Sequence, residues 1–158
     1  MGLEKCAHGI YMSRDAWIDE MYILQTRFSS MIFSHESALY FLDLSERESM
    51  QYTVTVKTGY NYTSLSKEGI KVYAIKPDFF EMGLTMVLSP TGRELRAYNA
   101  ERTICDIIRS RRYVEIQDFQ TALKIYSRRS EKNLPLLLRY AQEMRIEKVV
   151  RQYMEVMI

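Results

Sequence analysis

Apolar residues near the start of this chain recur with the period of an α-helix. Spacings of four, three and four residues place one set on a single helical face. This set is Trp17, Met21, Leu24 and Phe28. We therefore predict a helix over 15–27 with Ser13 as its cap, and a short apolar helix over 35–42 capped by Ser34.

The pattern then changes to the alternation of a β-strand. Apolar side chains at Tyr52, Val54 and Val56 alternate with polar ones, as in a half-buried strand. A helical turn near 63–69 separates this strand from the next, a spacing that suits a parallel crossover. The turn Ser89-Pro90-Thr91-Gly92 joins two more. The region 50–98 thus predicts a small mixed sheet of about four strands, at 52–57, 70–75, 84–88 and 94–98.

From residue 99 onward the apolar spacing is helical. Asn99 and Asn133 stand where N-terminal caps are expected, and Pro135 is tolerated in a first helical turn. Four helices are predicted: around 100–109, around 116–126, one that starts at the Asn133 cap, and around 146–157. The fold class is therefore α+β, with a helical C-terminal half over 99–158.

The first thirteen residues predict a hairpin around Ala7-His8-Gly9. A lone hairpin is at best marginally stable in water, so we expect it to belong to something larger. It looks like the wing of a winged helix-turn-helix whose helices would lie upstream. We divide the chain into a remnant wing, 1–13, and an effector domain, 14–158.

Composition excludes several classes. Of the 158 residues, 47% are apolar and 27% charged, and no apolar run approaches the roughly 20 residues of a membrane span. With no signal peptide and two distant cysteines, Cys6 and Cys105, we expect a cytoplasmic protein with reduced thiols. Two cysteines and two histidines at unhelpful spacings make a zinc site untenable, and we expect no metal and no cofactor.

The formal net charge of +2 is unevenly divided. Residues 1–98 carry 10 basic and 12 acidic side chains, whereas 99–158 carry 12 and 8. Two basic clusters, Arg109-Ser110-Arg111-Arg112 and Arg128-Arg129, fall at predicted helix ends, where cations stabilise the helix dipole. Contact with a phosphate or an acidic partner is the alternative explanation.

Catalytic patterns are sparse. Neither phosphate-loop glycines nor a zinc-protease motif is present, and a triad would need His8 or His35. We expect His35, at a helix start, to be structural. Asp78 and Glu94-Leu95-Arg96 resemble the carboxylate pattern of metal-dependent nucleases, with Arg96 where lysine is usual. Arginine cannot perform lysine's proton chemistry, so this stays an alternative.

Four segments together resemble the AbiEi family, the antitoxins of bacterial type IV abortive-infection toxin–antitoxin systems. The resemblance runs from the hairpin to the C-terminus. The segments are 9–11 (Gly-Ile-Tyr), 33–39 (Phe-Ser-His-Glu-Ser-Ala-Leu), 52–56 (Tyr-Thr-Val-Thr-Val) and 100–106 (Ala-Glu-Arg-Thr-Ile-Cys-Asp).

The resemblance implies a non-enzymatic regulator of a phage-defence operon. In that family an N-terminal winged helix represses the operon, and the C-terminal domain counters a nucleotidyltransferase-like toxin without a mandatory stable complex. This chain lacks the recognition helix, so operator binding would need the missing helices. Only Lys5, His8 and Arg14 remain as wing-type phosphate contacts. A truncated winged-helix regulator that senses or dimerises is a further alternative.

The helix over 100–109 also carries charge. Spacing predicts that Arg102 pairs with Asp106 and Glu101 with Arg109 on the helix surface. The arginines expected to meet a partner are Arg102, Arg109, Arg111, Arg112, Arg128 and Arg129.

Overall fold

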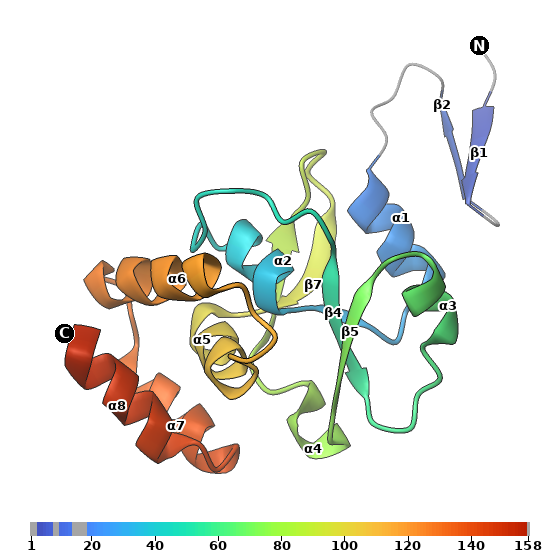
Figure 1. The fold of residues 1–158 in the computed structure, drawn as a ribbon. Helices are drawn as coiled ribbons and strands as arrows, with labels where there is room; N and C mark the ends of the chain where they lie inside the picture. The colour runs from blue at the N-terminus through green and yellow to red at the C-terminus, as the bar shows by residue number, and fades with distance from the viewer. Residues whose placement is uncertain (1–2, 8–9, 14–18, 158) are drawn as a thin grey trace.

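The computed structural model describes residues 3–7, 10–13 and 19–157. Its strands are β1 (Leu3–Ala7), β2 (Ile10–Ser13), β3 (Ile32–Phe33), β4 (Thr53–Lys57), β5 (Lys71–Ile75), β6 (Leu84–Leu88) and β7 (Glu94–Tyr98). Its helices are α1 (Glu20–Arg27), α2 (His35–Phe41), α3 (Thr63–Lys67), α4 (Pro77–Phe80), α5 (Ala100–Arg109), α6 (Ile116–Arg128), α7 (Leu134–Glu143) and α8 (Glu147–Met157). The predicted α+β class with a helical C-terminal half is confirmed (Figure 1).

Five strands form a mixed sheet in the order β5-β4-β3-β7-β6. β4 and β5 are parallel, as the short connecting helix α3 predicted, and β6 and β7 form the predicted antiparallel pair. The prediction of four strands starting near residue 50 missed β3, which lies between β4 and β7. Because β3 has two residues, it is too short to show an alternation of polar and apolar positions.

Helices cover both faces of this sheet (Figure 1). On one face, residues of α1 and α3 form a core with Phe33, Val54 and Ala97. On the other face, α2 and α5 pack over Ile32 and Tyr98, and α6, α7 and α8 extend the same core. The helical half is therefore an outer layer resting on α5 and continuous with the sheet.

The ends of the helices test the predicted caps. Asn99 and Asn133 accept hydrogen bonds from the backbone N–H groups of Arg102 and Leu136, as predicted. The cap predicted for the first helix is wrong: Asp19 caps α1, and Ser13 is the last residue of β2. Strand pairing at the hairpin uses the backbone of Ser13, so the helix starts later.

The hairpin predicted at the N-terminus is present as β1 and β2, which pair antiparallel in a two-stranded sheet of their own. Its assignment as a wing stays a prediction, and its turn at residues 8–9 lies outside the described residues. Among the described helices, none combines the length and apolar character needed to cross a membrane.

Candidate functional site

Two helices begin at the same edge of the sheet. β3 and β7 are parallel, with Phe33 opposite Ala97, and each continues directly into a helix, α2 or α5. This topology brings the segments 33–39, 52–56 and 100–106 together, the three segments of the family resemblance whose side chains are described. A polar cluster fills the space between them. Its buried members are Ser34, His35, Ser37, Thr53, Thr55, Arg102 and Asp106, and its half-buried members are Glu36, Lys71 and Tyr73.

Hydroxyl groups on β4 hold the start of α2. Ser37 N–H donates to Thr53 Oγ1 at 2.9 Å, and Thr53 N–H donates to Ser37 Oγ at 2.9 Å. Thr53 Oγ1 also donates to the carbonyl of Ser34. Ser34 is the N-cap residue of α2, as predicted, but its hydroxyl makes no capping hydrogen bond and instead accepts from Thr55 Oγ1 at 2.7 Å.

His35 lies at the centre of the polar cluster with a left-handed backbone, φ 50°. Its ring stacks on Tyr73 at a centroid distance of 3.6 Å, and its side chain lies between two hydroxyls. Nδ1 is 2.8 Å from Ser34 Oγ, and Nε2 is 3.3 Å from Ser110 Oγ. Burial, with the positive charges of Arg102, Lys71 and Arg109, holds the pKa of His35 well below its ordinary value. A neutral, enclosed imidazole agrees with the structural role predicted for it.

An ion pair closes one side of the polar cluster. Lys71 Nζ lies 3.3 Å from Glu36 Oε2 and donates to the carbonyl of Tyr113. Burial lowers the pKa of Lys71, but the neighbouring Tyr73 hydroxyl and Glu36 carboxylate outweigh it and raise the pKa above its ordinary value. Lys71 is therefore charged, and it ties β5 to α2 and to the loop after α5.

A second ion pair lies inside the core. Arg102 Nε is 3.0 Å from Asp106 Oδ1, which confirms the pairing predicted from their spacing. Both side chains are buried, with 0% and 4% exposed, so the predicted surface position is wrong. Arg102 Nη1 donates to the carbonyls of Phe79 and Met82, and its guanidinium lies 4.1 Å from the centroid of Tyr98. A partner therefore cannot reach Arg102.

The predicted pairing of Glu101 with Arg109 is also not found. Glu101 Oε2 accepts from the Tyr126 hydroxyl at 2.7 Å and from the Asn133 N–H at 3.2 Å, which joins α5 to α6 and α7. Tyr126 and Asn133 outcompete Arg109 because they hold Glu101 in the core, whereas Arg109 points to solvent.

Four polar atoms of the cluster are buried without a hydrogen-bond partner among the described residues. They are Glu36 Oε1, Tyr73 Oη, Arg102 Nη2 and Asp106 Oδ2. Burial raises the pKa of Asp106, although Arg102 opposes this shift. Unpaired buried polar groups reduce stability, so the polar cluster carries a cost that packing elsewhere offsets.

Three exposed arginines lie at the end of α5, next to this cluster. They are Arg109, the last residue of α5, with Arg111 and Arg112 just after it, here called the arginine segment, and Ser110 between Arg109 and Arg111 touches His35. Arg111 also donates to the carbonyl of Ile108 at 2.7 Å, which caps the helix end as the dipole interpretation predicts. Arg109 and Arg112 have no salt bridge within the described residues and can meet an anionic group.

The second basic cluster lies elsewhere. Arg128 is the last residue of α6 and Arg129 its C-cap, at the end opposite to the arginine segment, and a helix of 13 residues spans about 20 Å. Arg129 donates to the carbonyls of Leu42 and Asp43, whereas Arg128 is exposed. The two basic clusters are therefore separate surfaces.

The nuclease alternative requires Asp78 and Glu94 to share one metal ion. Asp78 lies on α4, whose Phe80 carbonyl accepts from the hydroxyl of Tyr98 at the end of β7. Glu94 begins β7, and a five-residue strand separates its ends by about 13 Å (Figure 1). Both carboxylates are exposed, and the structure does not bring them to one ion. The described residues contain no group of three or more metal-ligating side chains.

The wing contacts cannot be placed. Lys5 lies on β1, but its side chain is outside the described residues, as are His8 and Arg14. Their role as phosphate contacts stays a prediction.

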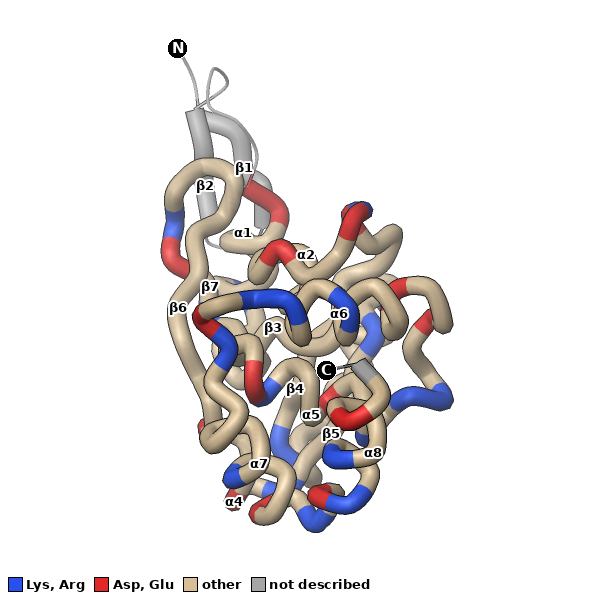
Figure 2. The backbone as a smooth tube through the Cα atoms, turned by 90° about the vertical axis from the view of Figure 1, so that its left-hand side faces the viewer, with Lys and Arg blue, Asp and Glu red and all other residues tan. Residues whose placement is uncertain are grey.

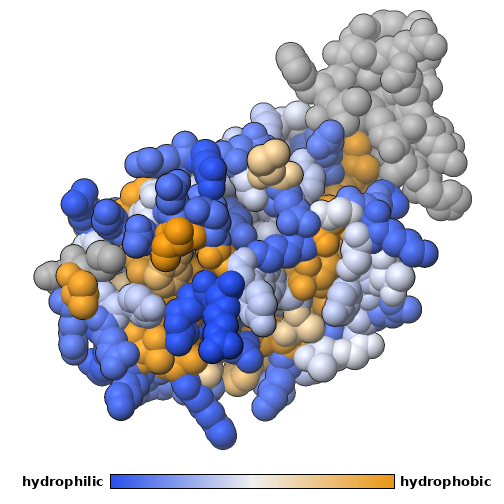
Figure 3. Space-filling model, in the orientation of Figure 1, coloured by the Kyte–Doolittle hydropathy of each residue, from blue (hydrophilic) through white to orange (hydrophobic). Residues whose placement is uncertain are grey.

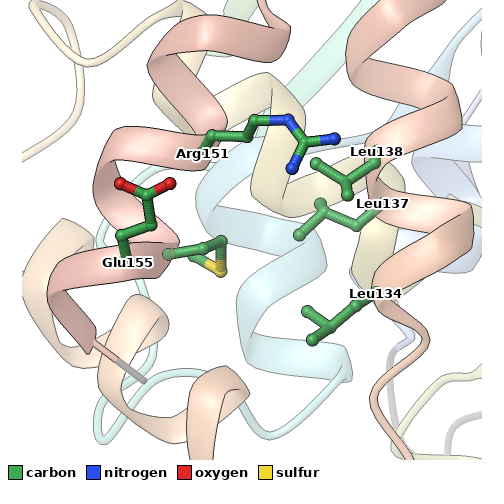
Figure 4. Close-up of a pocket in the computed structure, with 6 residues that line it drawn as sticks. Leu134, Leu137, Leu138, Arg151 and Glu155 are labelled. Atoms are coloured by element: carbon green, nitrogen blue, oxygen red, sulfur yellow. The ribbon is translucent and has the colours of Figure 1, made fainter.

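An apolar groove of about 300 Å³ lies between α7 and α8 (Figure 4). Its lining comprises Leu134, Leu137 and Leu138 from α7 and Arg151, Met154 and Glu155 from α8. Hydrophobic surface is visible over these C-terminal helices in the space-filling view (Figure 3). Sequence reasoning missed this groove because its apolar residues have the same helical spacing as core residues.

Models of known protein families give no match to this chain, and neither do curated protein sequences.

Proposed function

We propose that this chain is the effector domain of an AbiEi-like antitoxin, which counters a nucleotidyltransferase-like toxin in the bacterial cytoplasm. One observation carries the proposal: the three described segments of the resemblance meet in one polar cluster. Residues that recur together in a family and also build one cluster are expected to serve a shared structural purpose. Here that purpose is to position the arginine segment.

The chemistry of the exposed groups supports a charged partner. His35 is neutral and enclosed, Arg102 is buried, and the arginine segment is the part of this site that faces solvent. Guanidinium groups bind carboxylates and phosphates with paired hydrogen bonds. The arginine segment therefore suits an acidic surface of the toxin or a phosphate that the toxin uses, and antitoxicity needs no catalytic group of this chain.

A growth assay tests the proposal. The unmodified chain, expressed in trans with its nucleotidyltransferase-like toxin, should restore growth of the host. Arg109→Glu together with Arg112→Glu should weaken this rescue, because it reverses the charge of the arginine segment. Arg112→Glu should change the free energy of unfolding by no more than about 0.5 kcal/mol, and Arg109→Glu, which reverses a charge at the C-terminal end of α5, should lower it by about 1 kcal/mol.

The matched control is Arg139→Glu with Lys148→Glu, which makes the same charge change at exposed positions on α7 and α8. It should rescue like the unmodified chain at matched protein levels. If the unmodified chain fails to rescue, the antitoxin proposal is wrong. If both reversed variants rescue fully, the domain keeps its function and the arginine segment is not its contact surface.

A further inference from the structure

β6 is the outermost strand of the sheet, next to β7. Natural proteins protect such edges with lysine, proline, a bulge or a covering element. The sequence of β6, Leu-Thr-Met-Val-Leu, contains neither a charge nor a proline, and its register with β7 has no bulge. The charge-coloured view shows β6 as an uncharged strand at the border of the molecule (Figure 2). Within the part of the chain that the structure describes, this edge lacks the usual protection.

The register of β6 leaves backbone groups pointing outward. Asn99 N–H donates to the carbonyl of Gly83, and Ser89 N–H donates to that of Arg93. Hydrogen-bonded pairs alternate in an antiparallel ladder, so Thr85 and Val87 also face β7. Leu84, Met86 and Leu88 therefore direct their N–H and C=O groups to the free edge. The N–H of Leu84 donates to Glu81, whereas those of Met86 and Leu88 have no acceptor among the described residues.

The same three residues present their side chains on one face of the sheet. Leu84, Met86 and Leu88 are 38%, 49% and 66% exposed, whereas Thr85 and Val87 on the other face are half-buried. A free strand edge with unpaired backbone groups and a row of exposed apolar side chains is the kind of surface to which another β-strand pairs.

We propose that β6 pairs antiparallel with β6 of a second copy of this chain, around a two-fold axis at Met86. A two-fold interface requires one surface to complement itself, and this strand does so. In that register Met86 lies opposite Met86 of the second copy, and Leu84 lies opposite Leu88. Both strands end together, and no like charges face each other across the axis. The strand that pairs with the free edge of β6 is therefore β6 of a second copy, and the two five-stranded sheets join into one.

The pairing also satisfies the free N–H groups of Met86 and Leu88. The N–H and C=O of Met86 exchange hydrogen bonds across the axis, and the N–H of Leu88 donates to the carbonyl of Leu84 in the second copy. The bond from Leu84 N–H to Glu81 stays in place. The side chains of the two apolar rows then contact each other, as cross-strand neighbours do.

Light scattering and hydrogen exchange over a concentration series test this pairing on the full chain. We expect the mass to rise from one chain to two, and exchange at the amides of Met86 and Leu88 to slow over the same concentrations. Met86→Lys places two lysines opposite each other and should weaken dimerisation by about tenfold or more. Met50→Lys is the matched control, because Met50 is fully exposed in the loop before β4, and it should leave the dimer intact.

Three outcomes would overturn the proposal. A chain that stays monomeric throughout the series has no such interface. A dimer that persists unchanged in Met86→Lys uses another surface. Growth into larger particles that Met86→Lys suppresses would show open edge-to-edge aggregation in place of a closed pair. Circular dichroism of Met86→Lys should match that of the unmodified chain, which separates loss of pairing from loss of folding.

Discussion

Three constraints act together on His35. Its backbone is left-handed, a conformation in which histidine occurs more often than most residues, its side chain is 3% exposed, and its ring stacks on Tyr73. Burial, together with Arg102, Lys71 and Arg109, keeps its pKa well below the ordinary 6.5. The folded protein therefore holds His35 neutral at a pH where the unfolded chain would bind a proton.

This lowered pKa predicts a loss of stability in mild acid. The stabilising contribution is present above pH 6.5 and is lost as the pH falls toward the folded pKa, since only the unfolded state gains the proton. The slope for one such group is about 1.4 kcal/mol per pH unit. Urea unfolding at pH 7.0 and 5.5 should show this loss for the unmodified chain. His35→Gln should lower stability at pH 7.0 but remove most of the slope, and an unchanged slope would mean that other groups cause it.

The backbone of Gly83 packs closely against the buried side chain of Arg102. A Cβ at Gly83 would lie 2.6 Å from Arg102 Cβ, and the backbone φ is +82°. Gly83→Ala should therefore lower the free energy of unfolding by about 2–4 kcal/mol, from backbone strain and the clash together. Gly69→Ala is the control: its φ is +79°, but no atom lies within 4 Å of its Cβ position. It should cost about 1–2 kcal/mol, and equal losses at the two glycines would contradict the clash.

At the scale of elements, α2 owes its start to a neighbouring strand. The N–H of Ser37, in the first turn, finds its acceptor in Thr53 Oγ1 on β4 and not in the preceding serine. The helix and the strand are thereby held in one register, and His35 is held against Tyr73. A cap supplied from another element makes local helix formation depend on the tertiary fold.

Thr53→Val tests this dependence. The substitution keeps the shape and strand preference of the residue but leaves the buried N–H of Ser37 unpaired, which should cost about 1–3 kcal/mol. Thr85→Val is the control, because the Thr85 hydroxyl has no partner among the described residues, and it should change stability by less than about 0.5 kcal/mol. Both values come from urea unfolding at a concentration low enough to keep the chain monomeric. Similar losses of unfolding free energy for the two variants would contradict the capping role of Thr53.

At the scale of the whole molecule, the sequence predicted those helices and strands that local periodicity and capping residues mark. Alternation located β4, the short α3 predicted the parallel crossover from β4 to β5, the turn at 89–92 predicted the pair of β6 and β7, and Asn99 and Asn133 marked two helix starts. The polar cluster was missed because it depends on contacts between distant segments, such as Ser37 with Thr53 and His35 with Ser110. No period in the sequence encodes such contacts.

Arg102 illustrates the limit for the candidate site. Its spacing from Asp106 predicted the ion pair, yet charge alone suggested an exposed helix face. Its burial depends on carbonyls of Phe79 and Met82, which α4 and the following turn present 23 and 20 positions earlier in the chain. The exposed partners of a site could be predicted from charge, whereas the buried ones required the fold.

The central place of β3 has a consequence for biosynthesis. β3 pairs on one side with β4 and on the other with β7, whose Ala97 lies 64 positions after Phe33. A nascent chain emerging from the ribosome therefore holds one side of β3 open until residues near 98 have been made. During that interval Ile32 and Phe33, which the finished protein buries almost completely, lack the strand that encloses them. We expect partial chains that end before β7 to be the species most in need of a chaperone.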